Sequence, residues 1–362
     1  MFRRFFAWTQ KYERHLSALA MVVGFIVDNL FFERVDLWRT HAAFAGYALI
    51  CFISIPLLHY VETRAEAMNL PRPRWRSLLP IATQFALGGF WSAFFVLYVR
   101  SAVFAKSWPF LLLLVVALVG NELYRRYHER LVFTSVLFFF ALYSYAIFAV
   151  PVVTHSVGTS TFLLSGLAAL AVFGLFTALL RLVGRARFRA DISRIRAGAL
   201  AVLVLINVFY FTNVLPPLPL SARAAGVYHA VWREPGEYLA KAEREPWWVE
   251  YLGFTPTLHV VPGESVYAYS AVFAPTDLKT TIVHRWQRRD QETDRWVTRA
   301  AIAYPVVGGR DGGYRGYSAV LMSIAGQWRV NVETADGRLI ERLPFTVELV
   351  SLPPMQETIT LK

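Results

Sequence analysis

The sequence predicts an α-helical polytopic membrane domain with seven transmembrane helices, followed by a smaller all-β domain. Long apolar stretches dominate the chain up to residue 215, and an alternation of apolar and polar residues replaces them further on. A helix needs roughly 20 apolar residues to cross ~30 Å of hydrocarbon. Most of the seven stretches come near that length: 16–32, 42–61, 78–99, 108–123, 131–153, 162–182 and 197–215.

Basic residues between the stretches predict the orientation of this domain. Short cytoplasmic loops retain Lys and Arg, whereas translocated loops lose them. The N-terminus and the second, fourth and sixth loops carry 17 basic residues, against 4 on the alternate loops. With seven crossings and a cytoplasmic N-terminus, the chain after Leu215 lies in the periplasm if the membrane is a bacterial inner (cytoplasmic) membrane.

The net charge of +12 is therefore interpreted as a topology signal, with some attraction to the anionic lipid bilayer. Residues 221–362 carry 16 basic and 16 acidic residues, so the excess belongs to the membrane half and no nucleic-acid partner is predicted. The single cysteine, Cys51, lies in the second apolar stretch. The exported domain thus has no disulfide.

Residues 1–15 mix aromatic and basic side chains, which predicts an interfacial helix on the cytoplasmic leaflet. The small residues Ala18 and Ala20 precede the first apolar core, where a signal peptidase would not find its usual site. We therefore expect a membrane anchor that is not cleaved.

A proline-rich junction at residues 216–219 stops the last helix and marks a domain boundary. We assign 216–246 as the exit and connecting segment, with a short surface helix over 237–245. The β-domain is predicted to cover 247–362. Its strands show a period of two. Ile282, His284 and Trp286 share one face of a predicted strand, and Trp328, Val330 and Val332 share one face of a later strand.

Asp336-Gly337 fits a tight hairpin turn with positive φ between two such strands. Six to eight short antiparallel strands are expected. Two sheets packed as an immunoglobulin-like sandwich are the predicted arrangement, because the length and the regular turns suit it.

Five short motifs in the last part of the chain, in this order, resemble a bacterial module catalogued as domain of unknown function 2914. They are Ile282-Val283-His284-Arg285-Trp286, Tyr314-Arg315-Gly316-Tyr317-Ser318, Gly326-Gln327-Trp328-Arg329-Val330, Asp336-Gly337-Arg338 and Phe345-Thr346-Val347. Proteins with this module often carry a multi-pass membrane region before it. The resemblance implies the architecture and assigns no reaction.

No catalytic residue, cofactor or metal site is predicted. The chain lacks a phosphate-binding loop ending in Lys-Ser or Lys-Thr, a His-Glu-x-x-His helix, a Gly-x-Ser-x-Gly elbow and a Cys-x-x-Cys pair. Its eight histidines show no metal-ligand spacing. The glycine-rich segment 308–313 is interpreted as a flexible hairpin loop.

Asp28 is the deepest charge in the predicted bundle, on a helix face with Ser17, Ala20 and Gly24. It is either a proton or cation site or a structural partner of Arg100 or Arg34. Interfacial ion pairs account for Glu62 and Glu122. The neutral Gln84 and Asn207 suit hydrogen bonds between helices.

Aromatic and basic residues of the exported domain give further candidates for a ligand or partner surface. Trp247 and Trp248 suit either a membrane-interface anchor or a stacking platform. His284 and Trp286 suit either the core or a recognition face. Arg315 and Tyr317 complete the set of candidates.

Two functions follow from these observations. The first is a membrane protein that presents its periplasmic sandwich to a protein or glycan partner, for binding or assembly, without catalysis of its own. The alternative is a transporter or membrane enzyme with a polar site near Asp28. A third hypothesis, a sensor that passes a periplasmic signal inward, is weakened because the cytoplasmic loops are short and carry no recognisable output domain.

Overall fold

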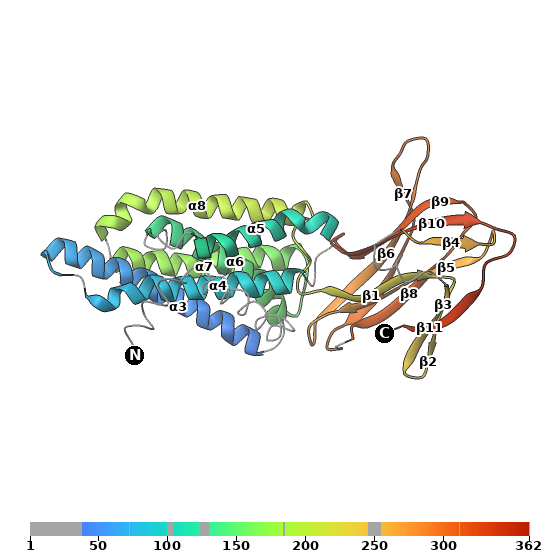
Figure 1. The fold of residues 1–362 in the computed structure, drawn as a ribbon, viewed down its shortest axis with the longest axis horizontal. Coiled ribbons are helices and arrows are strands. Elements are labelled where there is room, and N and C mark those ends of the chain that lie inside the picture. Colours follow the sequence, from blue (N-terminus) through green and yellow to red (C-terminus); the bar gives the residue numbers. More distant parts are fainter. Residues whose placement is uncertain are drawn as a thin grey trace, which may run out of the picture. The chain divides into compact units, whose positions relative to one another are not determined.

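The computed structural model describes residues 38–71, 73–99, 104–123, 130–183, 185–244, 255–310 and 312–361. These residues form two compact units, one helical and one built of β-sheets from Pro216 onward. Figure 1 shows the helices and strands with their labels. Asp28, Arg34, Arg100, the first apolar stretch and the predicted interfacial helix lie outside the described residues.

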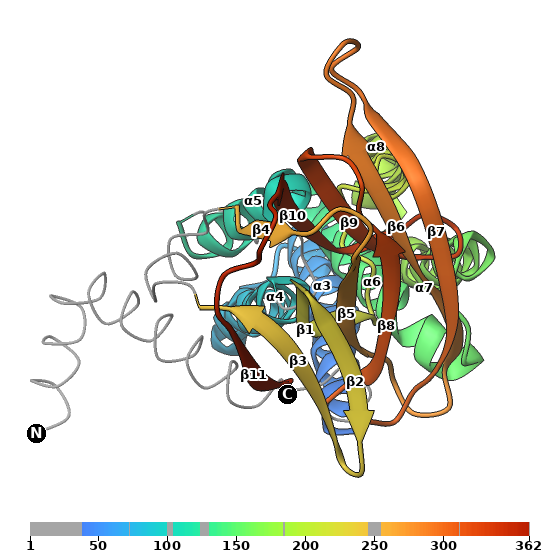
Figure 2. The same cartoon turned by 90° about the vertical axis from the view of Figure 1, so that its right-hand side faces the viewer.

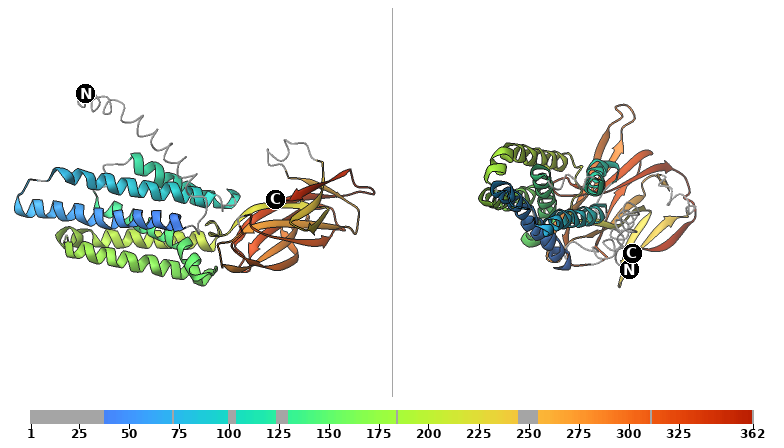
Figure 3. Two further views of the ribbon diagram at one scale, coloured as in Figure 1. Left: turned by 90° about the horizontal axis from the view of Figure 1, so that it is seen from below. Right: turned by 60° about the vertical axis from the view of Figure 1, so that its left-hand side comes forward.

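Six α-helices and one 3-10 turn are described in the helical unit (Figure 3). They are α3 (Trp38–Met68), η1 (Arg74–Ser77), α4 (Leu78–Val99), α5 (Phe104–Leu123), α6 (Leu131–Thr154), α7 (Thr159–Val183) and α8 (Arg185–Phe211). Five of them, α3, α4, α6, α7 and α8, contain segments long and apolar enough to cross a membrane. The unit is therefore consistent with a membrane protein.

The last helix begins earlier than the sequence suggested. The basic segment from Arg185 to Arg196, predicted to be a loop, is the first part of α8, and the helix ends at Phe211 rather than Leu215. Arg and Lys are good helix formers, so a basic segment can continue an apolar helix beyond the hydrocarbon. In α5, the shorter segment Ser107–Asn121 is the apolar part.

Aromatic rings fill much of the helical interior. Phe44 stacks on Phe90 and Phe94 with ring centroids 5.5 and 5.0 Å apart. Polar contacts also join helices, among them Ser54 to Thr83 at 2.7 Å, and the Asn207 amide, which donates to the Tyr143 hydroxyl at 3.2 Å. Asn207 thus forms a hydrogen bond between helices, as its neutral polar side chain predicted.

The ion pair expected for Glu62 is formed with Arg76, not with Arg64 in the same helix. Glu62 accepts a hydrogen bond from Arg76 Nε at 2.8 Å, while Arg64 donates to the Tyr60 hydroxyl at 2.8 Å. The ion pair joins η1 to α3 and neutralises a carboxylate that is 5% exposed. The side chain of Glu122 lies outside the described residues.

Eleven strands in three sheets form the described β unit (Figure 2). The strands are β1 (Ser221–Tyr228), β2 (Ala230–Glu234), β3 (Glu237–Glu243), β4 (Thr257–Val260), β5 (Ser265–Phe273), β6 (Lys279–Arg289), β7 (Trp296–Val307), β8 (Tyr314–Leu321), β9 (Gly326–Thr334), β10 (Leu339–Leu349) and β11 (Gln356–Leu361). The sheet orders are β1-β5-β8, β4-β10-β9-β6-β7 and β11-β3-β2.

The central strand of the β1-β5-β8 sheet, β5, is covered on both faces. On one side Val266 and Ala268 of β5 join Trp286, Val330 and others from the five-stranded sheet in one hydrophobic cluster. On the other side Tyr269 and Ala271 pack with residues of the β11-β3-β2 sheet. Successive side chains of a strand point to opposite faces, so β5 is buried almost throughout.

The connecting segment and the short helix were predicted wrongly. Residues 221–243 form β1, β2 and β3, and β1 pairs antiparallel with β5. Residues 237–243 are strand β3, paired with β2 across the turn at Pro235-Gly236. The β unit therefore begins near Pro216 and not at Trp247.

The strands that the alternation indicated are confirmed. Asp336-Gly337 lies in the turn between β9 and β10, with Gly337 at φ 81°. Two features differ from a purely antiparallel plan of hairpins. β4 pairs parallel with β10, and the glycine-rich segment leads from β7 to β8 in another sheet. The immunoglobulin-like arrangement stays a prediction.

Candidate binding surface

His284 and Trp286, two predicted contact residues, lie inside the β unit. Both side chains are fully buried on the inner face of β6. Trp286 packs edge-on against Phe345, with ring centroids 6.2 Å apart. Neither can touch a partner while the sheets stay together, so their place among the ligand candidates is corrected in favour of the core.

His284 connects two sheets through a buried polar network. Its Nε2 lies 2.8 Å from the Ser270 hydroxyl of β5, and its Nδ1 lies 2.8 Å from the Ser318 hydroxyl of β8. Trp286 Nε1 donates to Ser318 at 3.0 Å, and Tyr304 reaches Ser270 at 2.6 Å. Burial lowers the pKa of His284 from 6.5 to about 4, so the ring is neutral at pH 7. The network satisfies buried polar groups and links the two sheets to each other.

Arg315 and Tyr317 lie beside a cluster of tyrosines. Tyr317 is 43% exposed, and its ring centroid is 6.2 Å from that of Tyr267 and 6.4 Å from that of Tyr238. Burial raises the pKa of Tyr269 to about 12, against the opposing effect of the Arg315 charge. These two residues remain predicted partner contacts. The other candidates, Asp28, Arg100, Trp247 and Trp248, lie outside the described residues.

The outer face of the five-stranded sheet brings together polar residues that were not among the predicted site residues. Successive side chains of a strand point to opposite faces, so Arg285 and Gln287 on β6 and Arg329 and Asn331 on β9 lie on the face opposite Trp286 and Val330, where Asn331 itself is buried. The register places Arg342 of β10 opposite Asn331. We call Arg285, Gln287, Arg329, Asn331 and Arg342 the arginine face.

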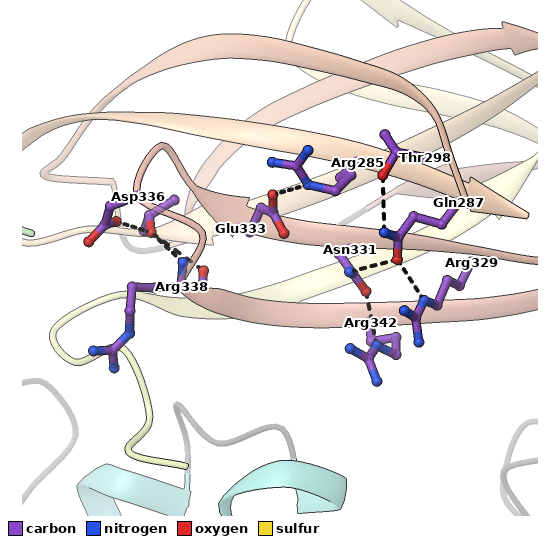
Figure 4. A network of polar contacts seen from close by, with 10 residues as sticks. Arg285, Gln287, Thr298, Arg329, Asn331, Glu333, Asp336, Arg338 and Arg342 are labelled. Carbon is purple, nitrogen blue, oxygen red and sulfur yellow. Dashed lines mark hydrogen bonds and ion pairs between the residues drawn. The ribbon is translucent and has the colours of Figure 1, made fainter. Parts of the chain in front are cut away.

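Side-chain amides connect this face across four strands (Figure 4). Gln287 Oε1 accepts from Arg329 Nε at 2.8 Å and from the Asn331 amide at 3.3 Å, and its own amide donates to Thr298 of β7 at 3.2 Å. Asn331 Oδ1 accepts from Arg342 Nε at 2.9 Å. The guanidinium groups of Arg329 and Arg342 are therefore held in fixed positions by amide oxygens, which carry no net charge.

Among the described residues, carboxylates pair with only part of the positive charge. Arg285 forms an ion pair with Glu333, and Arg289 at the end of β6 forms one with Asp294. Within the described residues, neither Arg329 nor Arg342 forms an ion pair with a carboxylate. Each has an amide oxygen as partner instead.

The surroundings of Arg329 and Arg342 oppose their charges. Desolvation by burial, with a smaller contribution from the charge of Arg342, lowers the pKa of Arg329 to about 10. Desolvation also lowers the pKa of Arg342, with Glu333 acting against it. The Arg329 guanidinium lies over the Trp296 ring, 4.1 Å from its centroid. An anion on this face would stabilise both cations.

The signal for this face was present in the alternation itself. Arg329, Asn331 and Glu333 occupy the positions opposite Trp328, Val330 and Val332, a pattern that usually means a solvated face. Only the pairing of β6, β9 and β10 shows that arginines from distant segments become neighbours.

A second polar cluster joins β3 to β4. Glu243 accepts hydrogen bonds from His229 Nε2 and His259 Nδ1, each at 2.7 Å, and from the His259 backbone N–H. Burial opposes ionisation, but these hydrogen bonds prevail and lower the pKa of Glu243. Among the described residues, no group of three His, Cys, Asp or Glu side chains has the geometry to hold a metal ion.

The molecule thus combines apolar helices of membrane-spanning length with a C-terminal β unit that carries a basic outer face. The family model described as protein of unknown function DUF2914 matches residues 279–347. The match confirms the resemblance of the C-terminal module and covers the whole arginine face. No curated protein matches the chain.

Two solved structures show weak similarity. A β-glucosidase from Listeria innocua in complex with gluconolactone has 14% identity and a TM-score of 0.20, over 38% of this chain and 18% of that one. The Pseudomonas fluorescens alkylpurine DNA glycosylase AlkC, bound to DNA with an abasic site analog, has 7% identity and a TM-score of 0.22, over 87% and 99%. At these scores neither similarity bears on the fold or function of this chain.

Proposed function

We propose that this chain is a bacterial inner-membrane protein that binds an acidic partner protein through its C-terminal β unit. Seven helices cross the membrane, the N-terminus is cytoplasmic, and the β unit is an immunoglobulin-like sandwich in the periplasm with an additional sheet. The chain serves binding or assembly and has no catalysis of its own. This proposal is carried by Arg329 and Arg342 on the outer sheet face, which form no ion pair within the described residues and have amide oxygens as partners.

Guanidinium groups recognise carboxylates through two parallel hydrogen bonds. Arg329 and Arg342 use Nε for the amide contacts, which leaves their Nη groups available for such a ligand. Because the two side chains are already positioned, binding would cost little conformational entropy. An acidic partner would also offset the desolvation and the smaller repulsion from Arg342 that lower the pKa of Arg329.

A protein partner fits this face better than an acidic glycan. Arg and Trp are the residue types most enriched at the energetic centres of protein interfaces, and Arg329 on Trp296 combines them. The guanidinium covers one face of the ring, so this face is not open for a sugar to stack on.

The test uses the full chain in nanodiscs, a fluorescent hexaglutamate peptide and an oligouronate of similar charge. We expect the peptide to bind more tightly and to weaken with added salt. The double variant Arg329→Gln/Arg342→Gln should weaken peptide binding at least tenfold, because each lost charged hydrogen bond contributes about 1.5–3 kcal/mol.

Arg299→Gln is the matched control. Arg299 lies on β7 in the same sheet and is exposed, so the variant loses one positive charge away from the arginine face, as each single variant, Arg329→Gln or Arg342→Gln, loses one on it. An equal loss in the control and in each single variant would show attraction by net charge alone and contradict the proposal. Preferential oligouronate binding would redirect it to a glycan.

The proposed topology predicts the behaviour of reporter fusions. A reporter active only outside the cytoplasm should be active when fused after Lys362, because 17 of the basic residues between helices lie on one side. The same reporter inserted at Arg187 should be silent. Activity at both positions, or the reverse pattern, would be incompatible with seven crossings and a periplasmic β unit.

A further inference from the structure

A groove between α7 and α8 combines a basic mouth with apolar walls. It consists of two adjoining cavities of about 470 and 660 Å³, both lined by Arg181 and Ala178 of α7 and by Phe188, Ile192 and Arg196 of α8. All belong to the helical unit. The groove therefore lies on the helices that would meet the lipid.

From the mouth, the groove continues along α7 and α8 toward Leu170 and Leu203 as an apolar channel. Leu170, Phe173 and Gly174 of α7 line it, together with Leu203 of α8. A Cβ on Gly174 would meet no atom within 4 Å, so the missing side chain leaves open space. From Leu170 to Arg181 the helix rises about 16 Å, which is close to half of the ~30 Å hydrocarbon thickness.

Three arginines surround the mouth. Arg181 lies near the end of α7, and Arg189 and Arg196 lie on α8, four and eleven residues after it begins at Arg185. None of the described residues that line the two cavities is acidic. The nearby Asp191 contacts Arg194 at 3.4 Å, and neither of them lines the groove.

We propose that this groove binds an anionic phospholipid. The phosphate lies among Arg181, Arg189 and Arg196, and one acyl chain fills the channel beside Gly174. Basic pockets at the cytoplasmic ends of membrane helices recognise anionic headgroups. A zwitterionic headgroup would bring its own cation to a mouth that already has three, so it binds more weakly. The inference rests on the proposed membrane insertion, with this end of α7 on the cytoplasmic side.

The experiment measures lipid binding to the full-length protein in a neutral detergent by native mass spectrometry. Dioleoyl phosphatidylglycerol is the anionic probe and dioleoyl phosphatidylcholine the zwitterionic one. We expect tighter binding of the anionic lipid. Arg181→Gln/Arg196→Gln should weaken this binding about thirtyfold, since each basic residue near an anionic lipid surface contributes about fivefold to the affinity.

Three further variants isolate the site. Arg194→Gln removes one positive charge from α8 outside the groove and should leave the affinity unchanged, whereas Arg181→Gln alone should weaken it about fivefold. Arg181→Lys/Arg196→Lys keeps the charge and should retain most of the binding. Gly174→Leu fills the channel without touching a charge and should weaken anionic lipid binding several-fold.

Each other result would overturn the assignment. Equal binding of the two lipids, with no effect of the arginine variants, would mean ordinary lipid contact. Competition by millimolar inorganic phosphate, with no effect of Gly174→Leu, would mean a site for free phosphate. The titration does not use the β unit, so its failure leaves the arginine face and the reporter test unaffected.

Discussion

Removal of residues 216–246 should abolish cooperative folding of the β unit. A fragment of residues 216–362 should unfold in one transition, whereas a fragment of residues 247–362 should not. The shorter fragment lacks β1, β2 and β3, so β5 loses its antiparallel partner β1. It also exposes Tyr269 and Ala271, which are now 1% and 0% exposed.

The expected loss is large compared with the stability of a domain of this size. Each large apolar side chain returned to water costs about 1.5–3 kcal/mol, and a whole domain is stable by about 5–15 kcal/mol. Circular dichroism and urea unfolding of both fragments provide the measurement. A cooperative transition of equal midpoint in the shorter fragment would show that β1 to β3 contribute nothing to the fold.

Acidification should destabilise the β unit through His284. Burial lowers the pKa of this ring from 6.5 to about 4, so between these values the unfolded chain binds a proton that the folded chain does not. The stabilisation is fully present above pH 6.5 and is lost as the pH falls toward 4. The total is about 3 kcal/mol at 1.36 kcal/mol per pKa unit.

His284→Gln provides the comparison, because its amide can still bond to the Ser270 and Ser318 hydroxyls but does not titrate. Urea unfolding of the 216–362 fragment at pH 7, 5.5 and 4.5 gives the free energies of unfolding. Glu243 titrates in both proteins, so the difference between them isolates the histidine. Parallel pH dependence in the two proteins would contradict a neutral buried imidazole.

Local pattern was sufficient to predict many elements of this fold. The apolar stretches of α4 and α6 and the alternation in β6 and β9 are each contained in one continuous segment. The hairpin at Asp336-Gly337 has a turn residue that adopts positive φ. Such features depend on neighbours in sequence, and the structure confirms them.

The errors arose where tertiary contacts override local preference. Residues 237–243 contain Glu, Lys, Ala and Leu, which favour helices, yet the segment pairs on both sides with β2 and β11. Pro235-Gly236 is a turn signal that would have indicated the hairpin. The arginine face required the pairing of β6, β9 and β10, which no local pattern specifies.

The position of the β1-β5-β8 sheet also limits how this protein can be engineered. A spectroscopic label on β5 would enter a packed interior at nearly every position, because the strand has a neighbouring sheet on each side. Labels or affinity tags belong instead on exposed positions of β7, such as Val297 or Arg299. Sequence variation among related proteins should follow the same division, with β5 the most restricted strand and the outer positions of β7 the most permissive.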